Sequence, residues 1–361
     1  MRRALRRLLT AVPFLAVAVA LSFQPGCTVG YLAQQGYFQA ELLAGREPLE
    51  KAIAEGHVDE AGAEKLRLIQ TIKAYGKDIG LSATDNYETI SPKWKRTIWN
   101  LSACDPVSFR SKTWWFPIVG TMPYLGFFRR PDADRWADPL RKQGWDVYLR
   151  TAGAYSTLGW FRDPVLPGML QWDEHDLADT VLHELAHATL WVPGSAQFNE
   201  SFAGFVGEEA AMKYMVAKYG ADGGPVVDVV QSDEDGEKFR AMMHGVYQEL
   251  DALYRDGDKS RPEKLVKKQQ ILASMPSRVQ QLGLHHEDRY LRAVRSGTWN
   301  NARLVQYRTY NRSRDWFEAV YVQENSDILA FIHRIGEITH KQADPYAALA
   351  EAVGANPKAE E

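Results

Sequence analysis

The sequence VLHELAHATLW spans residues 181–191 and has the spacing of an amphipathic helix, with leucine and alanine as its apolar backing. His183 and His187 are four residues apart, so their imidazole rings lie on one face of that helix at a separation suited to one metal ion. Glu184 follows the first histidine directly, and its carboxylate leans toward the open side of the metal without being a ligand. The stretch therefore predicts a helix with two metal-ligating histidines and a general base.

A catalytic zinc site needs a third protein ligand and an open position. The chain reads FNESFAG at residues 198–204. Asn199 has the character of a helix N-cap there, which puts Glu200 in the first turn of a new helix. Glu208 and Glu209 lie on other faces of this helix. We therefore predict Glu200 as the third ligand and rank the other two acids below it.

Small residues continue the helix face that starts at Glu200. Gly204, Gly207 and Ala211 follow it at spacings of four, three and four residues. A glycine inside a helix costs about 1 kcal/mol relative to alanine, so helix propensity does not explain two of them. Small residues let a second helix approach closely. The stripe therefore predicts that this helix packs against the face that carries the two histidines.

The first 26 residues have the composition of an export signal. Four arginines among the first seven residues precede a largely apolar run, Leu8–Leu21, which is shorter than the ~20 residues of a membrane-spanning helix. Cys27 follows in the place of the acylated cysteine of bacterial lipoproteins, although Gln24 and Pro25 depart from that signal. We expect a protein of the bacterial cell envelope, facing the periplasm and anchored to a membrane by lipid on Cys27. Plain secretion and an uncleaved anchor are the alternatives.

The rest of the chain has the composition of an ordinary globular protein, with 45% hydrophobic and 25% charged residues. Removing residues 1–26, which hold four arginines and no acid, changes the formal charge from −3 to −7. A mildly acidic body without a dense basic stripe argues against nucleic acid as a partner. We expect the lysine-rich stretch 259–268 to be a solvated helix face and Cys104 to be a buried thiol.

Hydrophobic periodicity predicts one elaborated, mostly helical unit over residues 27–361, with a small sheet. Residues 28–95 form a helical opening segment, 96–172 the sheet region, and 173–353 the helical region that holds the metal site. Residues 354–361 form a frayed tail. The helices expected in the third region are 174–191, 199–219, 235–255, 260–282, 315–334 and 341–353.

HELAH followed by NESFA resembles the gluzincin pattern of thermolysin-like and aminopeptidase-type zinc peptidases. Over nearly all of its mature length, the chain is similar to a family of bacterial proteins classed as zinc aminopeptidases, many of which have lipoprotein-like N-termini. The matching stretches are 115–126 (WFPIVGTMPYLG), 154–166 (AYSTLGWFRDPVL), 183–190 (HELAHATL), 198–207 (FNESFAGFVG) and 300–304 (NNARL).

The resemblance implies an α+β fold, mostly helical and zincin-like, with a small β-sheet packed beside the histidine-bearing helix. It implies one zinc ion held by His183, His187 and Glu200, in an enzyme that hydrolyses peptide bonds with Glu184 as the base. A peptide is then the substrate. Tyr155 and Tyr310 are further candidates, as donors of a hydrogen bond to the developing oxyanion. The list of candidate site residues is completed by Cys27, for lipidation.

Two other functions stay open. Zinc aminopeptidases carry an acid for the substrate amine upstream of the metal helix, and residues 153–157 hold a comparable place without an acid. An endopeptidase or a cell-wall peptide amidase therefore remains an alternative to an aminopeptidase. A non-catalytic envelope lipoprotein with a structural zinc site is the alternative of another class. Nothing in the sequence indicates a protein partner.

Overall fold

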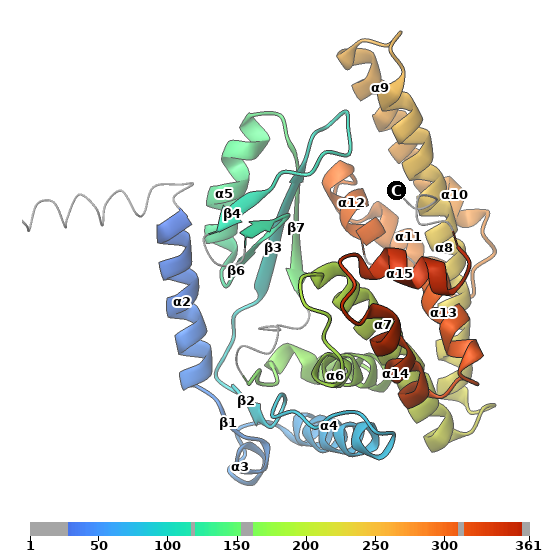
Figure 1. The fold of residues 1–361 in the computed structure, drawn as a ribbon. Helices are drawn as coiled ribbons and strands as arrows, with labels where there is room; N and C mark the ends of the chain where they lie inside the picture. The colour runs from blue at the N-terminus through green and yellow to red at the C-terminus, as the bar shows by residue number, and fades with distance from the viewer. Residues whose placement is uncertain (1–27, 117–119, 153–161, 310–313, 356–361) are drawn as a thin grey trace, which may run out of the picture.

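The computed structural model describes residues 28–116, 120–152, 162–309 and 314–355 (Figure 1). The first group of helices is α2 (Thr28–Ala44), α3 (Leu49–Ala54), α4 (Glu60–Asp78), α5 (Arg130–Lys142), α6 (Glu174–Thr189), α7 (Ala196–Tyr219) and α8 (Gly224–Arg255). The second group is α9 (Arg261–Ala273), α10 (Met275–Gln280), α11 (Glu287–Arg295), α12 (Asn301–Thr309), α13 (Arg314–Gln323), α14 (Ile328–Thr339) and α15 (Pro345–Ala352). The strands are β1 (Glu47–Pro48), β2 (Thr89–Ile90), β3 (Ile98–Cys104), β4 (Trp114–Phe116), β5 (Gly120–Met122), β6 (Leu125–Phe127) and β7 (Asp146–Ala152).

These elements confirm a mostly helical α+β fold with small antiparallel sheets. The largest sheet has the strand order β6-β3-β7, and β4 pairs with β5 in a separate hairpin. Leu101 in the middle of β3 lies opposite Leu125 of β6 and Leu149 of β7. Helix α5 packs against all three strands, while α12 packs against β3 and β7. A separate hydrophobic cluster lies between the sheet and α5, around Phe127 and Leu140.

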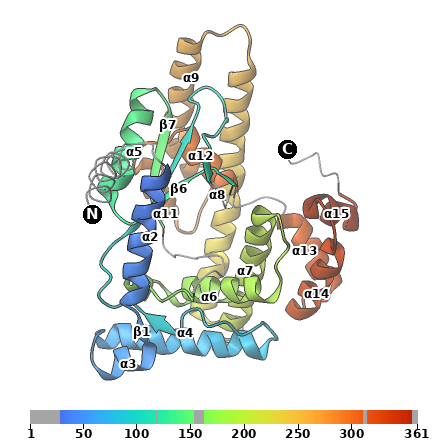
Figure 2. The ribbon, with the colours of Figure 1, turned by 60° about the vertical axis from the view of Figure 1, so that its left-hand side comes forward.

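The histidine-bearing helix α6 packs between α4 and α7 (Figures 1 and 2). Its N-terminus is capped by Asp173, whose carboxylate accepts the N–H of Asp176 at 2.8 Å. On α4, Leu66, Ile69 and Ile72 recur at a spacing of three residues and are fully buried. This is the apolar face that the periodicity of the opening segment predicts. Helices α4, α6 and α7 therefore share one core, which also includes α14.

Asn199 does not cap α7, and the predicted position of Glu200 in its first turn is wrong. The helix begins at Ala196, so Glu200 starts the second turn. The fully buried Asn199 side chain bonds the loop between α6 and α7 instead. Its Oδ1 accepts the N–H of Val192 at 2.8 Å, and its Nδ2 donates to the carbonyls of Val192 and Ser195 at 2.8 and 3.0 Å. The amide thereby satisfies both backbone groups of Val192 and adds a second hydrogen bond to the carbonyl of Ser195.

Three other helix boundaries differ from the prediction. The helix expected from residue 235 begins eleven residues earlier, because Pro225 is tolerated in its first turn. The helix expected over 260–282 is divided at Ser274, because Pro276, the second residue of α10, has no backbone N–H to continue the hydrogen bonds of α9. A break separates α13 from α14 where Asn325 has a left-handed backbone, with φ 56°.

Lys268 contradicts the prediction that its stretch is a solvated face. Its side chain is only 1% exposed. The ammonium group donates to the carboxylate of Asp146 at the start of β7 and to the carbonyl of Pro106 at 3.1 Å. The same carboxylate accepts the N–H of Asn301, the first residue of α12, at 2.8 Å. A buried ion pair therefore joins α9, β7 and α12.

None of the helices in the described ranges has the length and hydropathy that crossing a bilayer requires. In both ribbon views α9 projects upward, on the opposite side of the molecule from α4 (Figures 1 and 2).

Gly207 sets how closely α6 and α7 approach. A Cβ added at Gly207 would lie 2.6 Å from Oδ1 of Asp179, 2.9 Å from the carbonyl of the same residue and 3.1 Å from Cβ of His183. We therefore expect Gly207→Ala to separate the helices and to lower the free energy of unfolding by about 1–3 kcal/mol. Urea denaturation measures this.

Gly204 is the matched control, because among the described residues no atom lies within 4 Å of a Cβ added there. Gly204→Ala should be neutral or should stabilise the helix by up to about 1 kcal/mol. Equal destabilisation by the two variants would contradict the role given to Gly207.

The buried ion pair makes a second prediction. Asp146→Ala leaves the ammonium group of Lys268 buried without its carboxylate, so we expect the free energy of unfolding to fall by about 3–5 kcal/mol. Asp138→Ala is the control, because it removes an exposed pair with Arg141 and should cost no more than about 1 kcal/mol. Similar urea midpoints for the two variants would refute a structural role for the pair.

Candidate metal centre

The structure brings His183, His187 and Glu200 together. The distance from Nε2 of His183 to Oε2 of Glu200 is 3.6 Å, and that from Nε2 of His187 to Oε1 is 3.5 Å. One ligand atom from each residue lies within 4.8 Å of the other two. Two ligands bound tetrahedrally to zinc at ~2.05 Å are separated by ~3.3 Å. The three side chains therefore have nearly the separation that one small ion requires.

The chemistry of this donor set also fits zinc. Two imidazole nitrogens and one carboxylate oxygen are its usual ligands in catalytic sites. The two imidazole rings lie edge to face with their centroids 4.7 Å apart, as expected one helical turn apart on α6. Nδ1 of His187 is buried and has no hydrogen-bond partner among the described residues. This ring is therefore placed through packing and through its Nε2, which faces Glu200.

The carboxylate of Glu200 is anionic at neutral pH. Burial acts to raise its pKa, but the imidazoles of His183 and His187 outweigh this and bring the pKa to about 2. Burial likewise acts to lower the pKa of His183. Its contact with Glu200 and the negative charges of Glu184 and Glu200 prevail, so the pKa of His183 is raised. In the metal-free protein, the cluster thus favours a positive charge beside this carboxylate.

Within the described residues, Glu184 does not belong to the group of side chains that could hold an ion together with the two histidines. Its side chain is buried on α6, next to His183 in the chain. Burial raises the pKa of Glu184, against the effect of the imidazoles of His183 and His187. A carboxyl group with a raised pKa is better matched to proton transfer near neutral pH than an exposed one.

Two neighbours of Glu184 were not found by sequence reasoning. Tyr87 is buried and has a left-handed backbone, with φ 60°. Burial and the carboxylates of Glu184 and Asp163 raise the pKa of Tyr87 well above its ordinary value. The N–H of Tyr87 donates to the carbonyl of Asp163 at 2.8 Å, and the N–H of Asp163 donates to Oδ1 of Asn86 at 3.0 Å. Asp163 lies in the stretch 154–166 that carries the family resemblance, but no periodicity or motif pairs it with Tyr87, because the two meet only through a tertiary contact.

Glu208 and Glu209, the other candidate ligands, are paired with Arg314 instead of the histidines. The guanidinium group of Arg314 on α13 donates to both carboxylates, at 3.4 Å in the case of Glu209. Burial and the nearby charge of Glu318 raise the pKa of Glu209 to about 7. Within the described residues, neither acid belongs to a group that could hold a metal ion together with the histidines.

A second His and Glu group lies at the surface. It consists of Glu47, Glu55 and His57. Lys51 lies 3.6 Å from Glu47 and 3.9 Å from Glu55 and already supplies both carboxylates with a positive charge. The group therefore suits a metal ion less well than the centre on α6 and α7 does.

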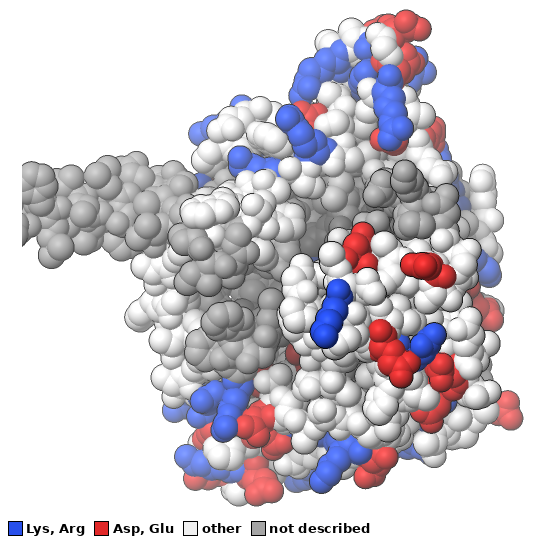
Figure 3. Space-filling view, viewed as in Figure 1, with Lys and Arg blue, Asp and Glu red and all other residues white. Residues whose placement is uncertain are grey.

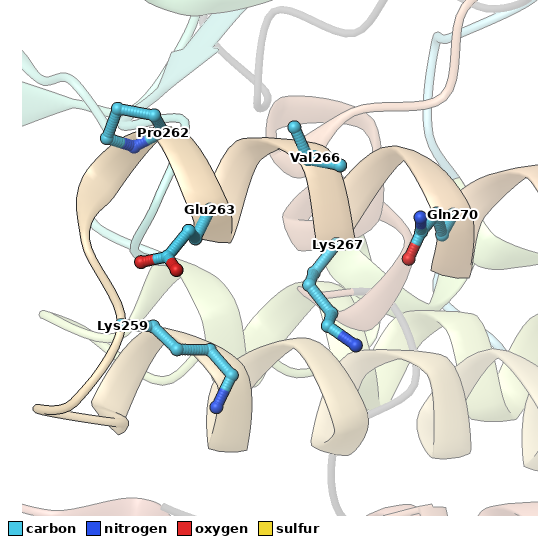
Figure 4. A pocket seen from close by; sticks show the side chains of 6 residues that line it. All are labelled: Lys259, Pro262, Glu263, Val266, Lys267 and Gln270. Atoms are coloured by element: carbon cyan, nitrogen blue, oxygen red, sulfur yellow. The ribbon is translucent and has the colours of Figure 1, made fainter.

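A hollow in the surface of α9 is separate from the metal centre (Figure 4). All of its lining residues come from α9 and the turn before it, and none comes from α6 or α7. They are Lys259, Pro262, Glu263, Val266, Lys267 and Gln270.

Three predicted site residues lie outside the described residues. They are Tyr155 and Tyr310, the candidates for oxyanion stabilisation, and Cys27, the candidate for lipidation. Cys104 is fully buried, as expected, and burial raises the pKa of its thiol to about 12. This thiol is therefore neutral and inaccessible at physiological pH.

Comparison with known proteins gives a family for this chain. A family model described as "Putative aminopeptidase" matches residues 30–348, which include the whole of α6 and α7. The description points to peptide hydrolysis. Comparison with curated proteins and with solved structures gave no match. Because the model matches most of the sequence, the chain belongs to this aminopeptidase family.

Proposed function

We propose that the protein is a zinc-dependent peptidase of the bacterial cell envelope, with His183, His187 and Glu200 as the ligands of one zinc ion. The observation that carries the proposal is the approach of both Nε2 atoms to the two oxygens of Glu200, at 3.6 and 3.5 Å. These ligands come from two helices that meet at a glycine. Such a placement is expected of a site built for an ion rather than of incidental surface histidines.

Zinc bound here would act as a Lewis acid toward the peptide carbonyl and would lower the pKa of water. Glu184 takes the proton from the attacking water and passes it to the leaving amine. Burial of this carboxylate raises its pKa, which favours both transfers near neutral pH. Glu200 stays anionic throughout, because the adjacent imidazoles hold its pKa far below neutrality.

The family description favours an aminopeptidase, which removes residues from the free N-terminus of a peptide. The alternative of an endopeptidase or a cell-wall amidase rests on the lack of an acid in residues 153–157. This segment lies outside the described residues. We therefore keep the aminopeptidase reaction as the proposal and test it with blocked substrates.

The proposed location is the periplasmic side of a bacterial membrane, with lipid on Cys27. The arginine-rich start and the apolar run of fourteen residues support export. Helix α2 begins at Thr28, so a lipid on the preceding residue would hold the folded chain close to the bilayer.

Removal of a ligand should remove the metal. We expect the wild-type chain to retain about one zinc ion after purification and His183→Ala to retain almost none, as measured by mass spectrometry of the metal. Zinc should also raise the Tm of the wild type but not of this variant, since an ion that binds only the native state stabilises it.

Glu209→Gln is the control, because that acid contacts Arg314 rather than the histidines. It should keep the zinc of the wild type. Full zinc occupancy of a chain that carries both His183→Ala and His187→Ala would rule out the assigned site.

The role of Glu184 is tested by Glu184→Gln. We expect this variant to keep its zinc while hydrolysis of short peptides falls by about 10²- to 10⁴-fold, because the amide cannot accept the proton of water. Comparing the cleavage of one peptide with a free and with an acetylated N-terminus shows whether the reaction requires the free amine. An aminopeptidase cleaves only the free peptide.

Equal cleavage of both peptides would favour the endopeptidase or amidase alternative. Zinc-loaded wild-type protein that cleaves neither peptide would instead support a structural role for the metal.

A further inference from the structure

Asp179 in the second turn of α6 has a carboxylate oxygen that is buried and unpaired. This oxygen, Oδ1, has no hydrogen-bond partner among the described residues. The acidic side chains seen over α14 and α15 in Figure 3 lie instead at the surface, where water solvates them. Burying a carboxylate oxygen without a partner costs free energy. Such a group in a folded protein therefore calls for an explanation beyond stability.

The contact between α6 and α7 leaves room for this oxygen beside a candidate metal ligand. A Cβ added at Gly207 of α7 would lie 2.6 Å from Oδ1 of Asp179 and 3.1 Å from Cβ of His183. Both atoms are thus close to the same point on α7, so the carboxylate and the histidine are neighbours in space. Any side chain at position 207 would displace one of them. The glycine therefore keeps Asp179 next to His183.

Helical geometry turns the ring of His183 toward this carboxylate. Side chains four residues apart lie on one face of a helix, and each leans toward the N-terminus of the helix. His183 follows Asp179 by four residues, so its ring leans over the turn that carries the acid. Its Nε2 is the ring atom that faces Glu200, at 3.6 Å. Nδ1 is then the ring atom that is left for a second partner.

The charges of the two side chains also interact. Burial raises the pKa of Asp179, and the imidazole of His183 is the group that most opposes this effect. His175 acts in the same direction as His183, whereas Asp176 and Asp233 add negative charge. In return, Asp179 is one of the acids that raise the pKa of His183. Asp179 and His183 are therefore coupled through charge as well as through packing.

The other imidazole of the centre has no comparable partner. Metal-ligating histidines usually donate the second ring N–H to a carboxylate, a carbonyl or water, and this bond fixes the orientation of the ring. Nδ1 of His187 is buried without a hydrogen-bond partner among the described residues. Orientation of the two rings by hydrogen bonding therefore depends on His183 and on the acid one turn before it.

We propose that Asp179 is a positioning residue of the metal centre, whose carboxylate accepts the Nδ1–H of His183 when a cation is bound at Nε2. The inference rests on the proposed function, since it takes His183 as a zinc ligand, and adds the group that orients this ligand. A carboxylate in that place fixes the tautomer of the imidazole and makes it a stronger ligand. Because the unpaired carboxylate costs free energy in the metal-free chain, it contributes to binding of an ion rather than to folding.

The test compares three variants of the full chain, with zinc chloride as the probe. Asp179→Ala removes the acceptor, and Asp179→Asn keeps an acceptor oxygen without the charge. Asp176→Ala is the matched control, because it removes one negative charge from the same helix at an exposed position. Competition with a chromogenic chelator measures the zinc affinity of each chain. Urea denaturation of the metal-stripped chains measures their stability without the ion.

We expect Asp179→Ala to bind zinc about 10- to 100-fold more weakly than the wild type, and Asp179→Asn to lose less. Asp176→Ala should stay within about twofold of the wild type, because solvent screens an exposed charge. Without metal, the urea midpoint of Asp179→Ala should not fall, because Oδ1 has no hydrogen bond to lose among the described residues. Zinc-loaded chains labelled with ¹⁵N-histidine give a further measurement. Asp179→Ala should have one ring N–H fewer that is protected from exchange with water.

A zinc affinity of Asp179→Ala within about twofold of the wild type would overturn the inference, since the loss of such a partner costs about 10-fold or more. An unchanged set of protected ring protons would also overturn it. So would a joint loss of zinc affinity and of metal-free stability in both variants at position 179, because this result would make Asp179 a residue of the fold.

Failure of the metal centre itself has a different signature. A wild-type chain that does not bind zinc, or that binds it no more tightly than His183→Ala, removes the ligand assignment and the inference with it. Zinc binding that is present in the wild type and lost in His183→Ala supports the ligand. The comparison of Asp179→Ala with Asp176→Ala then concerns the positioning residue alone.

Discussion

The close approach of α6 and α7 is the constraint on which the metal centre depends. The ligands come from both helices, so the spacing of the helices sets the spacing of the ligands. Gly207 permits this spacing, because a Cβ there would lie 2.6 Å from a carboxylate oxygen of Asp179. Gly76 allows a similar approach of α4 on the other side of α6, where a Cβ would lie 2.9 Å from Leu182. Asn199 then fixes the loop that joins the two helices. Two glycines and one buried amide thus hold the rings at a distance from Glu200 that suits an ion.

Several carboxyl groups that are removed from water lie close to the two histidines. Burial raises the pKa of Glu184 and also that of Asp179, which precedes His183 by one helical turn. Asp163 is buried nearby and adds to the negative charge at Glu184. Burying several carboxylates costs free energy unless a cation compensates them. In the metal-free protein, the imidazole of His183 responds to this charge through its raised pKa. A divalent cation between the ligands would compensate this charge at a pH where imidazole is neutral.

Local spacing was enough to predict that His183, His187 and Glu200 lie close together, while features set by tertiary contacts were not predicted. The two histidines share a face because of helical periodicity. The spacing of small residues from Glu200 to Gly207 likewise predicts, within a single segment, that another helix packs there. Asn199 was wrongly predicted to be an N-cap. An asparagine near the start of a helix can cap the helix or can bond the preceding loop, and the sequence does not distinguish the two. Lys268 was expected at the surface because its partner, Asp146, lies 122 residues away in the chain. The left-handed backbone of Tyr87 has no sequence signal, since tyrosine is not favoured in that conformation.

Helix α2 connects the sheet region with the core that carries the candidate metal centre. Tyr31 packs into the hydrophobic cluster of the sheet and α5, whereas Phe38 and Leu42, two and three turns further on, lie in the core shared by α4, α6 and α7. One rigid helix therefore contacts both clusters. Because α2 is packed from Tyr31 to Leu42, a change in the angle between the sheet region and the core around α6 would have to break contacts at one end of this helix.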